Sequence, residues 1–255
     1  DLLQPFAHRI DRVLSLQNGV ASEDVLSEAF GREKIIAGTI LNPISTPEPG
    51  LVRLEMRKGG IGLAAVGASS IDPIAAALKS IGLPLRVYAD YRSMKWSKLL
   101  LNLIGNATSA ILDMTTRQTF ADRRVFKIEM AALRETIQVM DALSIKPVVL
   151  PGYPVPLLIF ALRRLPLPLL QQAMRPLAAS GRGDKQPSLL MDLANGKTQS
   201  EIDELNGAVA RAGKSIGVKT PVNTALTEIV TDLVAGRANR NDWRQQVDKL
   251  ARRID

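Results

Sequence analysis

The sequence predicts an α/β domain followed by an all-α domain. Between residues 12 and 67, short β-rich runs alternate with turns and one helical segment, which is the pattern of strand–helix–strand units. After Asp90 the β-rich runs end, and apolar residues recur at spacings of three and four, which is typical of helices. A chain of 255 residues can bury two separate cores. We place the boundary near residues 88–93 and predict domains over 1–90 and 91–255.

The first domain is expected to form a parallel sheet with crossover helices. A strand in RVLSLQNG precedes a helix that starts at Ser22, which resembles an N-cap, and ends before Gly31. A strand, a helix and a strand in that order predict a βαβ unit at the edge of a parallel sheet. The later elements are strands in KIIAGTI, LVRLEM, IGLAAVG and LPLRVY, and a helix over 72–81 with Pro73 in its first turn and Gly82 after its end.

The second domain is predicted to be helical throughout. Its helices are expected over 93–112, 121–143, 187–195, 199–216 and 221–235. The stretch 147–176 is the most apolar part of the chain, and four prolines interrupt its uncharged run. A membrane-spanning helix needs about 20 apolar residues, so we expect packed helices joined by proline turns here and no membrane contact. An oligomer interface, such as that of a homodimer, is left open for this stretch.

Composition excludes several classes of site within these residues. Cysteine is absent, which excludes disulfides, thiolate metal sites and cysteine nucleophiles, and a cytoplasmic location is expected. His8 is the only histidine, so no metal site is predicted. The net charge is +8, but the basic residues are scattered and aromatic residues make up 4% of the chain. We therefore expect a small anionic ligand and no nucleic acid.

The first ten residues, DLLQPFAHRI, do not resemble a signal peptide. They lack a basic start, an apolar core and a small-residue cleavage site. They resemble part of a helix and contain no initiator Met. We therefore expect the native amino terminus to lie upstream.

The strongest candidate for chemistry is the run WSKLLLNLIGNATS at 96–109. At about 100° per residue in a helix, Lys98, Asn102 and Asn106 share one stripe between apolar neighbours. Unpaired burial of such groups costs a few kcal/mol each, so the stripe either faces water or lines a hydrogen-bonded pocket. An ammonium and two carboxamides would supply a proton donor and positioning groups for a keto acid. The residues alone leave a solvated face and a functional site equally open.

Three further candidates have ordinary structural explanations. Ser188 follows Pro187 at a predicted helix start, and Glu201 lies in the first turn of the next helix, so helix capping explains both. Asn18 and Gly19 follow a predicted strand at the sheet edge where ligands of open α/β folds bind. An Asn-Gly pair is also a common turn.

The run GIGLAA at 60–65 matches the dinucleotide-binding fingerprint in form only. That fingerprint needs a preceding buried strand and a helix that opens at its glycines. Here Arg57-Lys58-Gly59 precedes the run, and IGLAAVG itself is predicted to be a strand. We therefore reject this dinucleotide site.

Five sequence blocks, in this order, resemble the ketopantoate reductase (2-dehydropantoate 2-reductase) family. They are LQNG at 16–19, KWSKLLLNLIGNATSAI at 95–111, PSLLMDL at 187–193, SEIDELNG at 200–207 and GVKTPVN at 217–223. The similarity covers essentially the whole chain. It implies a Rossmann-type domain whose first strand and G-x-G-x-x-G turn are missing, followed by a helical domain like that of 6-phosphogluconate dehydrogenase.

The resemblance also implies an activity and a set of site residues. Family members use NADPH to reduce 2-dehydropantoate to the (R)-2-hydroxy acid, on the way to pantothenate and coenzyme A. Lys98 would be the general acid, and Glu201 would position both substrate and cofactor. Asn18 would contact the cofactor. The substrate-binding residues would be Asn102, Asn106 and Ser188.

Two alternatives are kept beside this expectation. One is a reductase of a different 2-keto acid, and the other is a non-catalytic helical binding or dimerisation module. A strand followed by G-x-G-x-x-G, encoded upstream, would favour an enzyme over the module.

Overall fold

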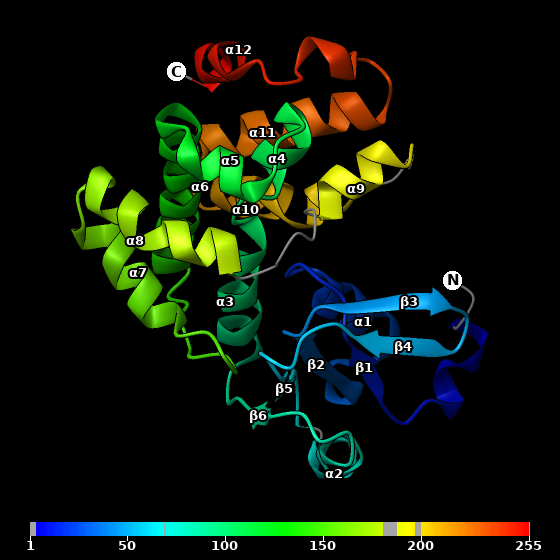
Figure 1. Ribbon diagram of the computed structural model, residues 1–255. Helices are drawn as coiled ribbons and strands as arrows, with labels where there is room; N and C mark the ends of the chain where they lie inside the picture. The colour runs from blue at the N-terminus through cyan, green and yellow to red at the C-terminus, as the bar shows by residue number, and fades with distance from the viewer. Residues whose placement is uncertain (1–3, 69, 181–187, 197–199, 255) are drawn as a thin grey trace. The chain divides into compact units, whose positions relative to one another are not determined.

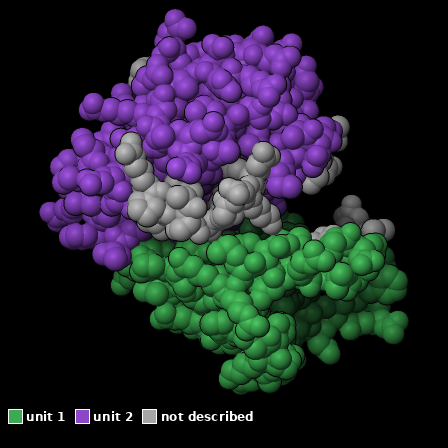
Figure 2. All heavy atoms as spheres, in the orientation of Figure 1, with its two compact units in different colours: residues 1–99, 145–156 green, residues 100–144, 157–255 purple. Residues whose placement is uncertain are grey.

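The computed structural model describes residues 4–68, 70–180, 188–196 and 200–254 (Figure 1). The chain divides into two compact units, shown in different colours in Figure 2: unit 1 comprises 1–99 with 145–156, and unit 2 comprises 100–144 with 157–255. The boundary expected near residue 90 falls at the start of the helix Tyr91–Leu103 (α3), which crosses the division. The limits of the functional domains stay a prediction.

Unit 1 is built on a four-stranded mixed sheet. Its strands lie in the order β1 (Val13–Ser15), β2 (Ile35–Ile40), β5 (Ile61–Ala65) and β6 (Leu85–Val87). Strands β1 and β2 run parallel through the crossover helix α1 (Ser22–Phe30), which confirms the predicted βαβ unit at the sheet edge. Strands β5 and β6 are also parallel.

Beyond the predicted unit the sheet is mixed and not parallel, because β2 and β5 are antiparallel. The chain returns from β2 to β5 through the hairpin of β3 (Ile44–Glu48) and β4 (Leu51–Leu54), and no helix carries it back across the sheet. A hairpin connection reverses the strand direction, whereas a parallel neighbour requires a crossover. Strand β5 is extended, as predicted, and no helix opens at Gly60 or Gly62.

The core of unit 1 lies between this sheet and the helix α2 (Asp72–Lys79). Ile36 and Leu63 are fully buried in it, with Ala75 of α2 against them. Helix α1 contacts β1 and β2. Ser22 is the first residue of α1 and not its cap, which corrects the prediction: the N–H groups of Asp24 and Val25 donate to the carbonyl of Ala21, so the first turn closes one residue earlier. Short 3₁₀ helices span Gln4–Arg9 (η1) and Arg32–Lys34 (η2).

Unit 2 is helical in its described part, as predicted. Its helices are α4 (Ala107–Leu112), α5 (Thr116–Ala121), α6 (Arg123–Ala142), α7 (Val155–Arg164), α8 (Leu167–Ser180), α9 (Ser188–Ala194), α10 (Asn206–Ser215), α11 (Pro221–Val234) and α12 (Val247–Ile254), with 3₁₀ helices at Glu201–Glu204 (η3) and Arg240–Asp242 (η4). Helix α6 runs through the centre, and α5, α10, α11 and α12 contact it (Figure 1). Val125, Leu226 and Val230 belong to its buried apolar core.

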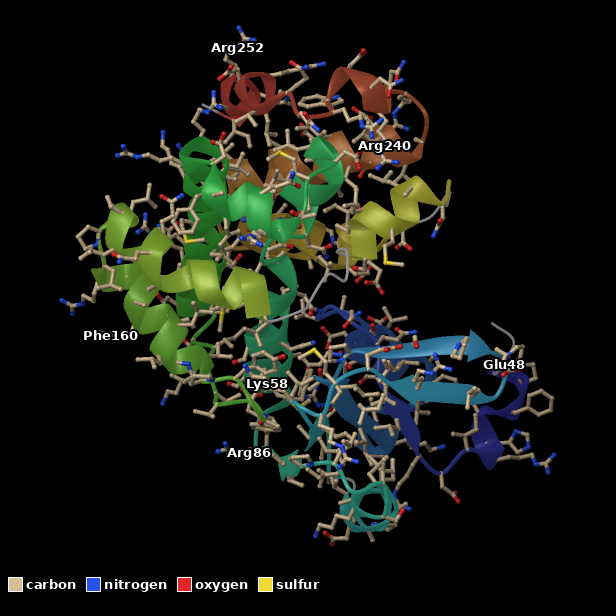
Figure 3. All side chains as sticks on the ribbon, viewed as in Figure 1. Glu48, Lys58, Arg86, Phe160, Arg240 and Arg252 are labelled. Carbon is tan, nitrogen blue, oxygen red and sulfur yellow. The ribbon has the colours of Figure 1, made fainter. Side chains whose placement is uncertain are left out.

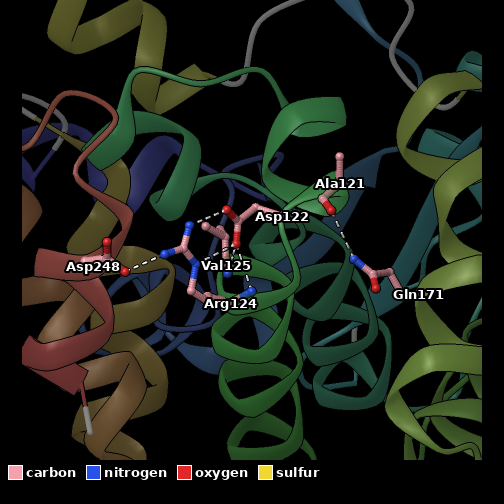
Figure 4. Close-up of polar contacts among 6 residues, drawn as sticks. All are labelled: Ala121, Asp122, Arg124, Val125, Gln171 and Asp248. Atoms are coloured by element: carbon pink, nitrogen blue, oxygen red, sulfur yellow. Dashed lines mark hydrogen bonds and ion pairs between the residues drawn. The ribbon is translucent and has the colours of Figure 1, made fainter.

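The start of α6 is fixed by polar contacts (Figure 4). The carboxylate of Asp122 accepts hydrogen bonds from the backbone N–H groups of Arg124, at 2.8 Å, and Val125, at 3.3 Å. The guanidinium of Arg124 bridges Asp122 and Asp248 of α12. Gln171 of α8 donates from Nε2 to the carbonyl of Ala121. The Arg124 bridge thus connects α6 to α12, and the Gln171 contact connects α8 to the end of α5.

The apolar stretch 147–176 forms two helices, α7 and α8, that meet at Pro166, which confirms the predicted proline-joined helices. None of the helices in the described part of the chain combines the length and apolar character needed to span a bilayer. Leu157 and Phe160 of α7 are 64% and 60% exposed, and Figure 3 labels Phe160 on this helix.

Candidate active site

Asp90 fixes the start of α3, the helix that carries the predicted general acid. Its carboxylate accepts hydrogen bonds from the backbone N–H groups of Arg92 and Ser93, both at 3.0 Å, and from the Ser93 hydroxyl at 2.6 Å. Partial burial raises the pKa of Asp90, but the hydrogen bonds from Ser93 and Arg92 outweigh it and hold the pKa below its usual value. A charged cap therefore stabilises this end of α3.

Lys98 and Asn102 lie one turn apart on α3, as predicted. Both side chains are half-buried, and both make interactions within the protein. Leu99 and Leu100 are fully buried and Leu103 is 3% exposed, so the helix is apolar around these two polar groups. The expectation that buried leucines surround the stripe is confirmed. Lys98 and Asn102 themselves keep part of their surface exposed.

Asn106 does not continue the same helix, which corrects the sequence prediction of one helix over 93–112. Helix α3 ends at Leu103, and α4 begins at Ala107. Gly105 has a positive φ of 63°, a conformation that breaks helices and favours glycine. Asn106 is 3% exposed, and its Oδ1 accepts a hydrogen bond of 3.3 Å from the backbone N–H of Leu189.

This contact brings Asn106 beside the start of α9, where Ser188 lies. Ser188 is the first residue of α9, as predicted, and its side chain is exposed. Its neighbour Pro187 lies outside the described residues. Helices α4 and α9 are in contact along this region. Two of the three predicted substrate-binding residues are therefore on adjoining segments of unit 2.

Glu201 begins the 3₁₀ helix η3, and its side chain is exposed and has an interaction partner. The hydroxyl of Ser200 caps this turn by accepting from the backbone N–H of Ile202 at 3.2 Å. Asn206 starts α10 just beyond η3 and is 1% exposed. Its Nδ2 donates to Oδ1 of Asn223 at 2.9 Å. The turn that carries Glu201 is thus capped at its start by Ser200, and the helix that follows it is anchored to α11 through Asn206.

Asn18 follows β1 at its carboxyl end, where the sequence placed it. Its side chain is exposed and has a partner within the protein. Gly19 has a positive φ of 88°, which the turn requires. The carbonyl of the preceding Gln17 accepts a hydrogen bond of 2.6 Å from Nζ of Lys95 on α3. Lys95 therefore connects the Asn18 turn to the helix that carries Lys98.

Sequence reasoning missed three buried carboxylates that support these segments. Glu129 accepts from the backbone N–H of Gly105 at 2.9 Å and from the Thr108 hydroxyl. Glu23 forms an ion pair with Lys95. One signal was available: Lys95 stands between Met94 and Trp96 in a helix that is apolar on most sides.

The third residue, Glu135 of α6, is hydrogen-bonded to the start of α11. It accepts hydrogen bonds from the backbone N–H groups of Val222, at 2.8 Å, and Asn223, at 2.9 Å, and from Nδ2 of Asn223 at 2.7 Å. Burial raises the pKa of Glu135, and the hydrogen bonds from Asn223 and Val222 offset this only in part. Within the described residues, no group of three or more potential metal ligands gathers.

Two family models match most of the chain. The model described as ketopantoate reductase PanE/ApbA matches residues 1–67, and the one described as ketopantoate reductase PanE/ApbA C terminal matches residues 90–234. These ranges contain all six predicted site residues. The second range alone spans more than half of the chain.

Curated relatives and solved structures agree with these matches. A 2-dehydropantoate 2-reductase of Halobacterium salinarum is 24% identical over 86% of this chain, and one of Pyrococcus horikoshii is 27% identical over 86%. The chain spans 66% and 65% of the length of these two relatives.

Two solved structures share the fold. A PanE/ApbA family ketopantoate reductase from Ralstonia eutropha has a TM-score of 0.69 and 25% identity, with 93% of this chain and 74% of that chain covered. A D-mandelate dehydrogenase with NADH has a TM-score of 0.73 and 24% identity, with 92% and 75% covered. Since the family models cover both the start and the helical part of the sequence, the chain belongs to the ketopantoate reductase (PanE/ApbA) family.

Proposed function

We propose that this protein uses NADPH to reduce the ketone of 2-dehydropantoate, or of a related 2-keto acid, to the (R)-2-hydroxy acid. One observation carries the proposal: Lys98 and Asn102 lie one turn apart on α3, among buried leucines, within the range matched by the family model. An ammonium in such apolar surroundings acts more strongly on a nearby charge than it would in water. We accordingly propose a role in pantothenate and coenzyme A biosynthesis and a cytoplasmic location.

Lys98 is the proposed general acid. When hydride reaches the ketone carbon, negative charge develops on the ketone oxygen. The Nζ ammonium of Lys98 stabilises that charge and donates a proton to the oxygen, which gives the hydroxyl group of the product. Lys98 is half-buried, with the fully buried Leu99 and Leu100 beside it in α3, so its side chain is expected to meet less water than that of an exposed lysine.

The remaining predicted residues bind and orient the reactants. Asn102, Asn106 and Ser188 offer carboxamide and hydroxyl groups that suit the hydroxyl and carboxylate of the substrate. Glu201 is proposed to hold both substrate and cofactor in position. These roles need no movement of protons at any residue besides Lys98.

The residues present fit a nicotinamide group at Asn18. The side chain is exposed at the carboxyl end of a strand that pairs in parallel, and its amide can both donate to and accept from a ring carboxamide. The cofactor supplies the hydride when it is bound. Asn18 is proposed to orient the ring beside the substrate.

The test is NADPH oxidation by the protein produced from its complete gene, with 2-dehydropantoate as substrate and with Lys98→Ala as the variant. Removal of a general acid is expected to lower kcat by about 10²- to 10⁴-fold. Lys79→Ala, which removes an exposed lysine of α2, is the matched control and should leave turnover unchanged.

The outcomes separate the parts of the proposal. Turnover in the parent that is lost in Lys98→Ala supports both the reaction and the role of Lys98. Turnover with phenylglyoxylate or 2-ketoisovalerate but not with 2-dehydropantoate would move the substrate to another 2-keto acid. Equal turnover in the parent and in Lys98→Ala would contradict the general-acid role.

A further inference from the structure

A buried ion pair connects three segments of unit 1 that bear on the proposed site. Nζ of Lys95, on α3, lies 2.9 Å from Oε1 of Glu23 in the first turn of α1. The two side chains are 2% and 0% exposed. The same Nζ donates to the carbonyl of Gln17 at 2.6 Å. One ammonium thus joins α1, α3 and the turn after β1.

The pair is poorly suited to stabilise the fold. Removing two charges from water costs several kcal/mol each, and this cost is regained only when the geometry is good and further hydrogen bonds satisfy both groups. Neither carboxylate oxygen of Glu23 has a hydrogen-bond partner among the described residues, so its contact with Lys95 is ionic and not an aligned hydrogen bond. Apolar side chains of similar size would be expected to serve stability at least as well.

The pair is better placed to fix the position of the Asn18 turn relative to α3. Lys95 precedes Lys98 by three residues on the same helix, so the two side chains leave α3 from neighbouring positions. Gln17 immediately precedes Asn18. A hydrogen bond from Lys95 to the Gln17 carbonyl therefore sets the backbone of the Asn18 turn against the helix that carries Lys98. The carboxylate of Glu23, 2.9 Å from the Lys95 ammonium, holds that ammonium in place at this carbonyl.

We propose that Glu23 and Lys95 are positioning residues, which hold the Asn18 turn in register with Lys98 for the reduction. This inference rests on the proposed function. Neither residue touches a reactant. Their effect is on geometry, and a displacement of about 1 Å at a reacting group can cost on the order of 100-fold in rate.

The decisive variant is the double substitution Glu23→Leu with Lys95→Met. It removes both buried charges and keeps similar volumes, so the unfolding midpoint in urea should be equal to that of the parent or higher. The contact with the Gln17 carbonyl is lost. We expect kcat to fall by about 10- to 100-fold while KM changes by less than about 3-fold, because binding groups remain and alignment is lost.

A second readout does not depend on turnover. Backbone amide hydrogen exchange at residues 17–20 reports directly whether the turn is held. We expect exchange there to quicken by about 10-fold or more in the double variant, with exchange in β2 and β5 unchanged. Leu63→Ala, a destabilising variant in the core of the same sheet, is the matched control: it lowers the urea midpoint without a selective effect at 17–20.

The outcomes distinguish this inference from the proposed function. Faster exchange at 17–20 together with a fall in kcat supports the positioning role. Unchanged exchange at 17–20 overturns it, whatever the activity. A double variant with full kcat also overturns it. Absence of turnover in the parent counts against the proposed reductase, and the exchange measurement still decides whether the pair holds the turn.

Discussion

Oε2 of Glu129 accepts a hydrogen bond of 2.9 Å from the backbone N–H of Gly105, 24 residues earlier in the chain. Oε1 of the same carboxylate accepts from the hydroxyl of Thr108. Glu129 is 2% exposed. A buried acceptor on α6 therefore holds the turn that separates Asn102 from Asn106.

Glu129→Gln should destabilise the protein. An amide in place of the carboxylate directs its NH₂ group at one of the two donors, and leaving a buried donor unsatisfied costs about 1–3 kcal/mol. Urea unfolding measures the loss. Glu228→Gln, at an exposed ion pair with Arg253, is the control and should change the midpoint very little. An equal effect in the two variants would contradict the importance of the buried acceptor.

Gly105→Ala should cost more than Gly217→Ala. Both glycines have a positive φ, 63° and 72°, so both variants carry the strain of a left-handed alanine, about 1–2 kcal/mol. At Gly105 a Cβ would also lie 2.5 Å from Cγ2 of Thr116, whereas nothing lies within 4 Å at Gly217. The difference between the two urea midpoints isolates the steric part. No difference would mean that Thr116 moves aside freely.

The contribution of Glu135 to the free energy of unfolding should fall as the pH rises. Burial raises its pKa in the folded state above the ordinary value of 4.5, so the folded state holds the proton more tightly than the unfolded state. The stability that this gives is fully present below pH 4.5 and is lost as the pH rises through the folded pKa. Urea unfolding gives the free energy of unfolding of the parent and of Glu135→Gln. We expect the parent's value minus the variant's value to fall with rising pH. A difference that grows with pH would contradict this.

Asp122 should show the opposite pH dependence. The hydrogen bond from Arg124 lowers the pKa of Asp122, and the backbone N–H groups at the start of α6 lower it further. Its stabilising effect is therefore present above the ordinary pKa of 3.8 and is lost as the pH falls through the lowered value. Near neutral pH, Asp122→Ala should cost about 1 kcal/mol, as expected for loss of an N-cap. Thermal unfolding at several pH values checks both points, with Asp248→Ala as a control that keeps the cap.

The sequence predicted those elements whose cause is local. The run KIIAGTI forms the buried strand β2, because the side chains on both of its faces are packed inside the protein. Helix α6 follows from twenty residues of regular apolar spacing. Helices α5 and α12 were not predicted. Helix α5 has only six residues, and half of the eight residues of α12 are charged.

Features that depend on distant residues could not be predicted. The break between Asn102 and Asn106 depends on Glu129, which is remote in sequence. The burial of Lys95 and Glu23 becomes apparent only when α1 and α3 are packed. The candidate site was predicted from Lys98 and its carboxamide neighbours, whereas among the supporting residues only Lys95, between Met94 and Trp96, left a signal in the sequence.

Within the described residues, β3 and β4 form a two-stranded sheet of their own, and another molecule could add a strand to such a sheet and start aggregation. Val52 is 64% exposed and Leu51 is 43% exposed, so such a pairing would also bury apolar surface. Pro47 lacks the N–H that a new strand would need, and the register shifts between Ser45 and Glu48. The proline and the irregular register thus act as gatekeepers against edge-to-edge association, and replacing Pro47 with a β-branched residue would remove one of them.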